Sequence, residues 1–372
     1  MPNSLRAIVQ SYDPGLPLAQ ATTPPSAWYT DARIAELEQT AVFARTWQFA
    51  GRAPQVRHPG QYITTEIAGE PVLIVRDRER RLRGFFNVCR HHAAALLDLP
   101  EGCAEQLRCP YHGWTYALSG ELIQTPEFAA VEGFDRAAHG LVPIEIGELH
   151  GWLFARIAPG AEHLGNSLDA DLLGTLGDLS IERLQWCERR SYTLPCNWKV
   201  FVDNYLDGGY HVPHLHKELN GVLSAGKYRI TTGARHCLQT SEMNNAGAQA
   251  TIGTVRQGQN AFYLWIYPNL MINRYQDVMD TNLVRPLGAE RCEVIFDYYF
   301  DDVSTDAQNR NRASIEVSEA IQEEDRVICK SVQRGLRSRA YDTGRLSVRR
   351  EAGAHLFHKL LHADLVARLR EG

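Results

Sequence analysis

The feature that most constrains this chain is a pair of short motifs, C-x-H and C-x-x-H, separated by 17 residues. Their four possible ligands are Cys89, His91, Cys109 and His112. Both motifs fall where hairpin tips are expected, so two loops can hold one metal centre between them. Tetrahedral zinc accepts two cysteines and two histidines, and a structural zinc site is one interpretation. A two-iron cluster is the other, because two thiolates on one iron and two imidazoles on the other use the same four residues.

The order of the ligands favours the iron cluster. Each motif mixes one cysteine with one histidine, whereas zinc fingers group the two cysteines apart from the two histidines. His92 has the wrong spacing and is interpreted as a polar neighbour, and Cys103 as an ordinary thiol. The eight cysteines of the chain are too few and too irregular for a disulfide framework.

Composition excludes several classes of function. The 372 residues are 44% hydrophobic and 22% charged, which is typical of a globular protein with one large or two ordinary domains. The net charge of -5 and the lack of a long basic run argue against binding of nucleic acid. No secretory signal and no run of roughly 18 apolar residues is present, so we expect no membrane association and a cytoplasmic location.

The texture of the sequence changes along the chain and predicts an α+β protein. Residues 31–50 have amphipathic helical periodicity, and residues 60–156 consist of short β-branched runs between turn residues. A Gly-, Ala- and polar-rich stretch at 157–170 reads as a linker. Strands are expected over 227–300, and helices over 305–338 and 350–370. These patterns divide the chain into segments 1–45, 46–156 and 157–372.

A second group of histidines lies in the stretch NYLDGGYHVPHLH, at His211, His214 and His216. Spacing alone would pair His211 with His214, because residues three apart share a helix face. Pro213 weakens that argument, since it interrupts regular helix between them. From the residues alone, the choice of pair stays open.

These motifs, with CPYHGW, YPNLMINRYQD, EDRVICKSVQRGL and AYDTGR, resemble the Rieske non-haem iron oxygenases. The resemblance covers most of the chain from about residue 85. Within the family, the chain most resembles choline monooxygenase and related betaine and carnitine oxygenases. It implies a Rieske 2Fe-2S cluster on the first four ligands. The family motif N-x5-Y-H-x4-H then places Asn204 among the catalytic residues and assigns His211 and His216 to a mononuclear Fe(II), with His214 as a non-ligand.

Such an iron site requires one carboxylate in addition to two histidines. The helix expected over 305–338 has an apolar stripe formed by Val317, Ile321, Ile328, Val332 and Leu336, and Asp325 lies roughly 40° from Ile321. Glu324 lies roughly 60° away on the other side. The family's aspartate ligand occurs in an E-D context on a C-terminal helix, and this resemblance selects Asp325.

The sequence departs from the family where a carboxylate usually connects the cluster to the iron. That carboxylate commonly lies three residues before the first histidine, where this chain has Gly208. Asp207 and Asp203 are the candidates to replace it, and Asp207 is preferred.

The family also implies an architecture. It consists of a helical leader over 1–45 that packs on the catalytic domain, an all-β Rieske domain over 46–156, and a helix-grip catalytic domain over 157–372 with an antiparallel sheet and long C-terminal helices. A homotrimer is implied, with electrons supplied by NAD(P)H through a separate flavin or iron-sulfur reductase.

One further pattern in the sequence agrees with a cationic substrate. Alternation along AFYLWIYP places Tyr263, Trp265 and Tyr267 on one face of a strand, where aromatic rings can bind a methylated ammonium. Filling of the core is the plainer explanation for these rings. The expected activity is oxidation of choline or a betaine with O2, and the alternatives are an aromatic-acid ring hydroxylase and a Rieske electron-transfer protein.

Overall fold

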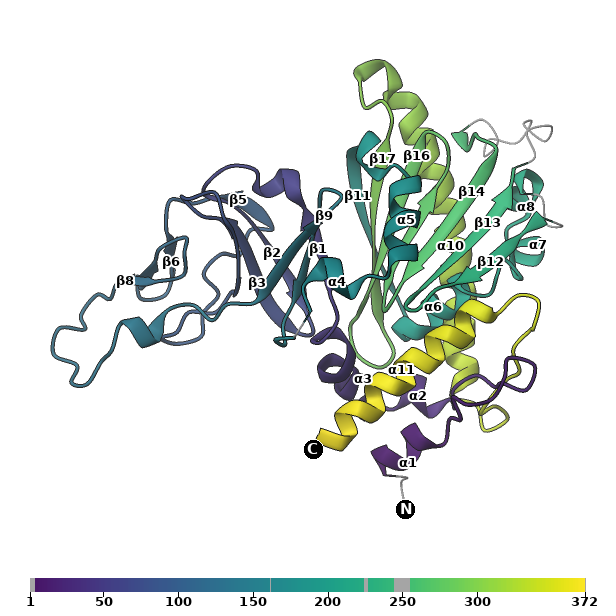
Figure 1. The fold of residues 1–372 in the computed structure, drawn as a ribbon, viewed down its shortest axis with the longest axis horizontal. Helices are drawn as coiled ribbons and strands as arrows, with labels where there is room; N and C mark the ends of the chain where they lie inside the picture. The colour runs from purple at the N-terminus through teal and green to yellow at the C-terminus, as the bar shows by residue number, and fades with distance from the viewer. Residues whose placement is uncertain (1–3, 161, 224–226, 244–254, 372) are drawn as a thin grey trace. The chain divides into compact units, whose positions relative to one another are not determined.

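The computed structural model describes residues 4–160, 162–223, 227–243 and 255–371, which form two compact units (Figure 1). One unit spans Gln39–Ser167, and the other combines Met1–Glu38 with Leu168–Gly372. The N-terminal segment therefore belongs to the same unit as the C-terminal half. No described helix is long and apolar enough to cross a membrane.

The unit Gln39–Ser167 is built of short antiparallel strands, as expected for this part of the chain. Three small sheets have the strand orders β1-β10-β9, β4-β3-β2-β5 and β6-β7-β8. Apolar side chains that alternate along β2 and β3 fill the core between the first two sheets. The strands are β1 Gln48–Arg52, β2 Gln61–Ile67, β3 Glu70–Arg76, β4 Leu82–Phe86, β5 Glu101–Cys103, β6 Leu107–Arg108, β7 Thr115–Tyr116, β8 Leu122–Gln124, β9 Glu145–Leu149 and β10 Trp152–Arg156.

The amphipathic segment 31–50 is shorter as a helix than its pattern suggests. Helix α3 covers Ala32–Glu38 and continues as a π-helical turn over Gln39–Phe43, after which strand β1 begins at Gln48. Ile34, Val42 and Phe43 of the apolar stripe are buried and Leu37 is half-buried, but the stripe ends at Phe43. The next four residues, Ala44 to Trp47, form a turn that leads into β1.

The second unit contains a seven-stranded antiparallel sheet with the order β11-β17-β16-β15-β14-β13-β12 (Figure 1). This is the sheet of the helix-grip fold. Its strands are β11 Gln185–Leu194, β12 Arg229–Thr232, β13 His236–Glu242, β14 Asn260–Ile266, β15 Leu270–Arg274, β16 Val278–Pro286 and β17 Cys292–Phe300.

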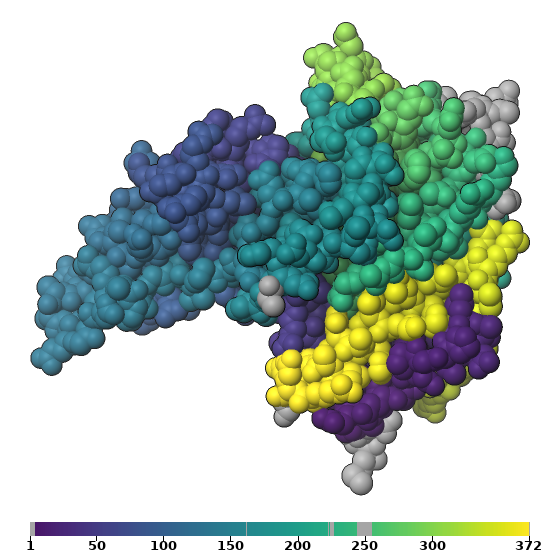
Figure 2. Space-filling model, in the orientation of Figure 1, coloured from purple at the N-terminus to yellow at the C-terminus, as the bar shows by residue number. Residues whose placement is uncertain are grey.

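Two long helices and several short ones pack against this sheet. The N-terminal segment lies along α11 on the surface of the same unit (Figure 2), where Tyr12 packs on His362. The helices of this unit are α1 Leu5–Gln10, α2 Ala27–Thr30, α3, α5 Ala170–Asp178, α6 Trp198–Tyr205, α7 Val212–Leu215, α8 Lys217–Val222, α10 Gln308–Leu336 and α11 Ala352–Glu371, and α4 Leu164–Ser167 closes the other unit.

The apolar stripe expected on α10 is only partly buried. Val317 and Leu336 are buried, but Ile328 is 37% exposed and Val332 43% exposed. The buried face of the helix instead includes polar residues such as Ser318 and Gln322. A stripe drawn from apolar residues alone therefore misses the part of the helix that faces the interior of the unit.

A buried ion pair connects the N-terminal segment to α6. The ammonium of Lys199 lies 2.5 Å from Glu38 Oε1, and the indole N–H of Trp198 donates to Glu38 Oε2 at 2.8 Å. Lys199 is 0% and Glu38 1% exposed. Loss of either partner would leave the other charge buried without a counter-charge, which is strongly destabilising.

Two candidate metal centres

The two loops that carry the C-x-H and C-x-x-H motifs close in the same way. The N–H of Cys89 donates to the carbonyl of Ala94, and the N–H of Cys109 donates to that of Trp114, both at 2.8 Å. The positive φ of +73° at Gly113 allows the second loop to turn back on itself. The backbone thereby presents the cysteine and histidine of each motif from one tight turn.

The burial of the four side chains differs by residue type. Cys89 and Cys109 are 2% and 3% exposed, whereas His112 is exposed and His91 half-buried. The ring of His91 stacks on Trp114 at 4.7 Å between centroids. Burial, with His92 and His112 nearby, lowers the pKa of His91, which favours the neutral imidazole that binds a metal. The thiols thus lie inside the unit and the imidazoles near its surface.

This arrangement fits a two-iron cluster better than a single zinc ion. Four ligands of one zinc ion must lie close enough together to touch it at about 2.0–2.3 Å. Within the described ranges, the group whose ligand atoms all lie within 4.8 Å of one another is His211, His216 and Asp325, and it includes none of the four residues at 89–112. A cluster with thiolates on one iron and imidazoles on the other has no such requirement.

Replacing Cys109 with serine is expected to remove the cluster and its red-brown colour, because a hydroxyl is a poor substitute for a thiolate. Visible absorption and iron content of the purified chain measure the loss. Cys103→Ser is the matched control, since Cys103 lies in the same region with an exposed side chain. Equal loss of colour in both variants would contradict the assignment of Cys109.

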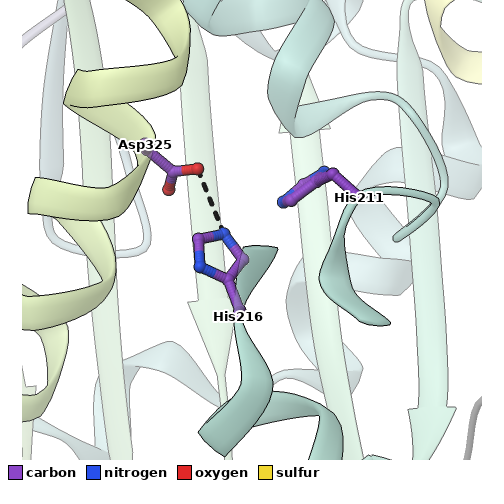
Figure 3. A group of neighbouring side chains, drawn as sticks. All are labelled: His211, His216 and Asp325. Atoms are coloured by element: carbon purple, nitrogen blue, oxygen red, sulfur yellow. Dashed lines mark hydrogen bonds and ion pairs between the residues drawn. The ribbon is translucent and has the colours of Figure 1, made fainter. Parts of the chain in front are cut away.

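The second centre brings together three side chains from separate parts of the chain (Figure 3). His211 and His216 flank the short helix α7, and Asp325 projects from α10. Asp325 Oδ1 lies 3.1 Å from Nε2 of His216, and the two imidazole centroids are 4.9 Å apart. Two imidazoles and one carboxylate form the ligand set of non-haem Fe(II) sites with open coordination positions.

Each histidine of this centre is held by a carboxylate at its other nitrogen. Nδ1 of His211 lies 2.6 Å from Asp207 Oδ2, and Nδ1 of His216 lies 2.6 Å from Glu324 Oε2. Both Nε2 atoms are thereby left for a metal. Sequence reasoning weighed Glu324 only as a possible ligand and missed this role, which its position next to Asp325 could have suggested.

The carboxylates around this centre favour the binding of a cation. Burial lowers the pKa of His216, but hydrogen bonds and charge from Asp325 and Glu324 outweigh it, so the pKa lies above its ordinary value. Asn204 adds a further contact, because its amide donates to Asp325 Oδ1 at 2.8 Å. A divalent metal ion would balance these carboxylates.

The two candidate connecting carboxylates lie in different surroundings. Asp207 also accepts the backbone N–H of His211 at 2.9 Å, whereas Asp203 accepts from Tyr29 and contacts Nε2 of His358 at 2.7 Å. At Gly208 the φ is +69°, and a Cβ atom would lie 2.2 Å from the carbonyl oxygen of Arg350. This backbone leaves no room for a carboxylate at position 208.

A cavity of about 110 Å³ lies next to the three ligands, between the sheet and helices α6 and α10. Four tyrosines line it, and burial raises the pKa of all four phenols, so they stay neutral. These are Tyr205, Tyr228, Tyr263 and Tyr275. Its polar lining includes Asn204, Arg256, Asn273, Asp280, Asn282, Ser318 and Gln322.

Of the three aromatic residues expected to bind substrate, the cavity includes only Tyr263. Trp265 is fully buried, with its ring packed on Phe357 of α11 and its N–H donating to the carbonyl of Pro268. The hydroxyl of Tyr267 donates to Asp364 of α11 at 2.7 Å. Trp265 and Tyr267 therefore fill the core between the sheet and α11.

Comparisons with known proteins agree with this division. Residues 46–135 match the Rieske [2Fe-2S] domain, and residues 181–365 match the ring hydroxylating alpha subunit (catalytic domain). The chloroplastic choline monooxygenase of Arabidopsis thaliana is 38% identical, over 98% of this chain and 87% of its own length. The carnitine monooxygenase oxygenase subunit of Escherichia coli (strain K12) is 29% identical, over 92% and 93%.

The solved structures include a similar fold. The quaternary ammonium Rieske monooxygenase CntA in complex with L-carnitine superimposes with a TM-score of 0.82 at 29% identity, over 92% of this chain and 96% of its own. A 2Fe-2S ligand set and an open-sided iron ligand set in one chain define the class of iron-dependent oxygenase components. This chain belongs to the Rieske non-haem iron oxygenases, as an α subunit.

Proposed function

We propose that this chain is a monooxygenase component that hydroxylates a small quaternary ammonium substrate. The observation that carries the proposal is the tyrosine-lined cavity beside His211, His216 and Asp325. Faces of neutral aromatic rings attract a methylated ammonium by about 0.5–2 kcal/mol each. Relatives named as choline and carnitine monooxygenases, which align over nearly the whole chain, support the same substrate class.

The residues present fit both metal groups. Cys89, His91, Cys109 and His112 would hold the 2Fe-2S cluster, and His211, His216 and Asp325 the mononuclear iron. When bound, these groups carry electrons and activate O2 for hydroxylation of a C–H bond.

Residues of the chain orient the metal ligands and the substrate. Asp207 and Glu324 hold the two imidazoles through their Nδ1 atoms, and Asn204 holds the carboxylate of Asp325. The four tyrosines would position the ammonium with one carbon towards the metal ligands. Hydroxylation of a carbon that bears oxygen or nitrogen gives an unstable product, which collapses to an aldehyde or releases formaldehyde.

A reductase partner and a trimer complete the proposal. Electrons would come from NAD(P)H through a separate flavin or iron-sulfur reductase, and three copies would assemble so that the cluster of one chain supplies the iron of the next. His112 and Tyr111 are exposed at the tip of the cluster loops, which is consistent with transfer to a second copy.

Oxygen uptake by the reconstituted system tests the substrate class. Choline, glycine betaine, γ-butyrobetaine and benzoate are supplied separately with a compatible reductase, and aldehyde or formaldehyde is measured alongside oxygen. We expect uptake coupled to product with at least one quaternary amine. Uptake coupled to product with benzoate alone would instead identify an aromatic-acid ring hydroxylase.

Replacing Asp207 with asparagine is expected to leave both metal groups bound and to slow turnover by about 10- to 100-fold, as for other residues that orient a metal-bound histidine. The amide cannot replace the charged acceptor that now faces Nδ1 of His211 at 2.6 Å. Iron content and single-turnover rate measure the two effects. Unchanged turnover would remove Asp207 from the mechanism, and Asp203→Asn serves as the comparison at the other candidate.

A further inference from the structure

Two side chains in the cavity wall carry N–H groups that meet no acceptor among the residues that the structure describes. Arg256 is 3% exposed and Gln322 4% exposed, and both line the cavity. Nη1 of Arg256 and Nε2 of Gln322 have no hydrogen-bond partner in the described part of the chain. Buried donors are rarely left unpaired, so these two indicate a missing acceptor.

The remaining contacts of Arg256 fix its position without satisfying Nη1. Its Nη2 donates to the hydroxyl of Ser318, and its guanidinium lies 4.8 Å from the ring centroid of Tyr275. Asp280 Oδ1 lies 3.8 Å from Nη2, which is too long for a hydrogen bond. Arg256 is thus held in place while one of its strongest donors stays available.

The carboxylate of Asp280 is already engaged elsewhere. Its Oδ2 accepts from the amides of Asn273 and Asn282, at 2.7 and 2.8 Å. These contacts hold Asp280 in place, and its carboxylate lies close enough to the guanidinium of Arg256 to balance its charge. The wall therefore offers two unpaired donors.

Helix α10 shows how far the two donors lie from the metal ligands, because Gln322 belongs to this helix and Arg256 donates to its Ser318. Gln322 precedes Asp325 by three residues of α10, and Ser318, which holds Arg256, precedes it by seven. At 1.5 Å per residue, these separations are about 4.5 and 10 Å along the helix axis. An extended substrate with one end at the metal ligands would bring its other end to this part of the wall.

We propose that Arg256 and Gln322 bind the carboxylate of a zwitterionic quaternary amine whose ammonium lies against the tyrosines of the cavity. This inference rests on the proposed function and narrows its substrate class to betaines. A carboxylate only accepts hydrogen bonds and has two oxygens, which matches two unpaired donors. A hydroxyl has a single oxygen and an O–H donor of its own, so it would pair less well with the two unpaired N–H donors.

A matched series of ligands tests the proposal in the iron-loaded holoenzyme. γ-Butyrobetaine carries a carboxylate, 4-hydroxybutyltrimethylammonium a hydroxyl, and pentyltrimethylammonium neither group. We expect γ-butyrobetaine to bind at least about 10-fold more tightly than pentyltrimethylammonium, by calorimetry without turnover. Tightest binding of the hydroxyl compound, or equal binding of all three, would overturn the proposal.

Variants identify the residues responsible. Gln322→Met keeps the size of the side chain, and we expect it to weaken γ-butyrobetaine about 10-fold while it changes pentyltrimethylammonium less than about twofold. Gln308→Met, on the exposed first residue of the same helix, is the matched control and should change neither. An equal loss for all three ligands in Gln322→Met would mean a merely structural role and would overturn the assignment.

Arg256 requires a paired change, because its removal alone would leave Asp280 buried without a counter-charge. Arg256→Met with Asp280→Asn keeps the wall neutral and should abolish the preference for the carboxylate. If the unmodified protein binds and oxidises pentyltrimethylammonium without any advantage for γ-butyrobetaine, only this inference fails. If no ligand of the series and no other quaternary amine binds, the proposed function fails with it.

Discussion

Replacing Asp325 with alanine is expected to abolish oxygenase turnover, by more than about 100-fold, while the protein stays red-brown. The carboxylate lies 3.1 Å from Nε2 of His216 and is the one acidic member of the three-ligand group. Without it, two imidazoles cannot hold Fe(II) firmly, so about one iron atom per chain should be lost. The cluster ligands at 89–112 lie in the other unit and should keep their irons.

Iron analysis, visible absorption and oxygen uptake measure this result together. Glu323→Ala is the matched control, because Glu323 lies two residues away on α10 and pairs with Arg326 on the exposed side of the helix. Full iron content and undiminished function in Asp325→Ala would instead indicate a Rieske electron-transfer protein. The same outcome would leave the tyrosine-lined cavity without a catalytic role.

Replacing Lys199 with methionine is expected to lower the free energy of unfolding of its unit by about 3–5 kcal/mol. The methionine fills similar space, but it leaves the carboxylate of Glu38 buried at 1% exposure without its ammonium partner. Denaturant unfolding followed by tryptophan fluorescence measures the loss, since Trp198 donates to the same carboxylate.

The double change Lys199→Met with Glu38→Leu separates the loss of the pair from the loss of packing. We expect it to recover most of the stability, because neither charge is then left alone. Arg326→Met, which breaks an exposed pair with Glu323, should leave the unfolding midpoint unchanged. A Lys199→Met protein as stable as the original would show that Glu38 takes up a proton at little cost.

The metal ligands could be predicted from the sequence because metal binding restricts both the type and the spacing of the residues. In the C-x-H and C-x-x-H motifs, the ligand types fit either zinc or a two-iron cluster, and the mixing of one cysteine with one histidine in each motif favours the cluster. For the second centre, spacing alone left His211, His214 and His216 undecided, and resemblance to the family was needed. Asp325 was a candidate because it lies near the apolar side of the expected helix, where a carboxylate needs a cation, but resemblance to the family was again needed to select it.

The cavity wall was harder to predict, because its residues come from several separate strands and helices. Alternation predicts which side chains share a face of β14, but it does not predict which helix covers each end of the strand. Tyr263 therefore reaches the cavity while Trp265 lies under α11. The pairing of Arg256 with Asp280 joins a residue in the segment before β14 to a residue of β16, and no local pattern indicates it. Asp280 and Asn282 are two residues apart on β16 and therefore share one face of the strand, and both line the cavity. This spacing of two polar residues could have indicated a polar cavity wall.

The left-handed turn at Gly208 has a consequence for protein engineering. Arg350 donates to the carbonyl of Gly208 at 2.9 Å, and its own carbonyl occupies the space where a side chain would begin. Grafting an acidic residue onto this position would push the loop before α11 away from α6. Exchange of this segment between oxygenases that carry the acid at different positions therefore requires transplanting both loops as one module.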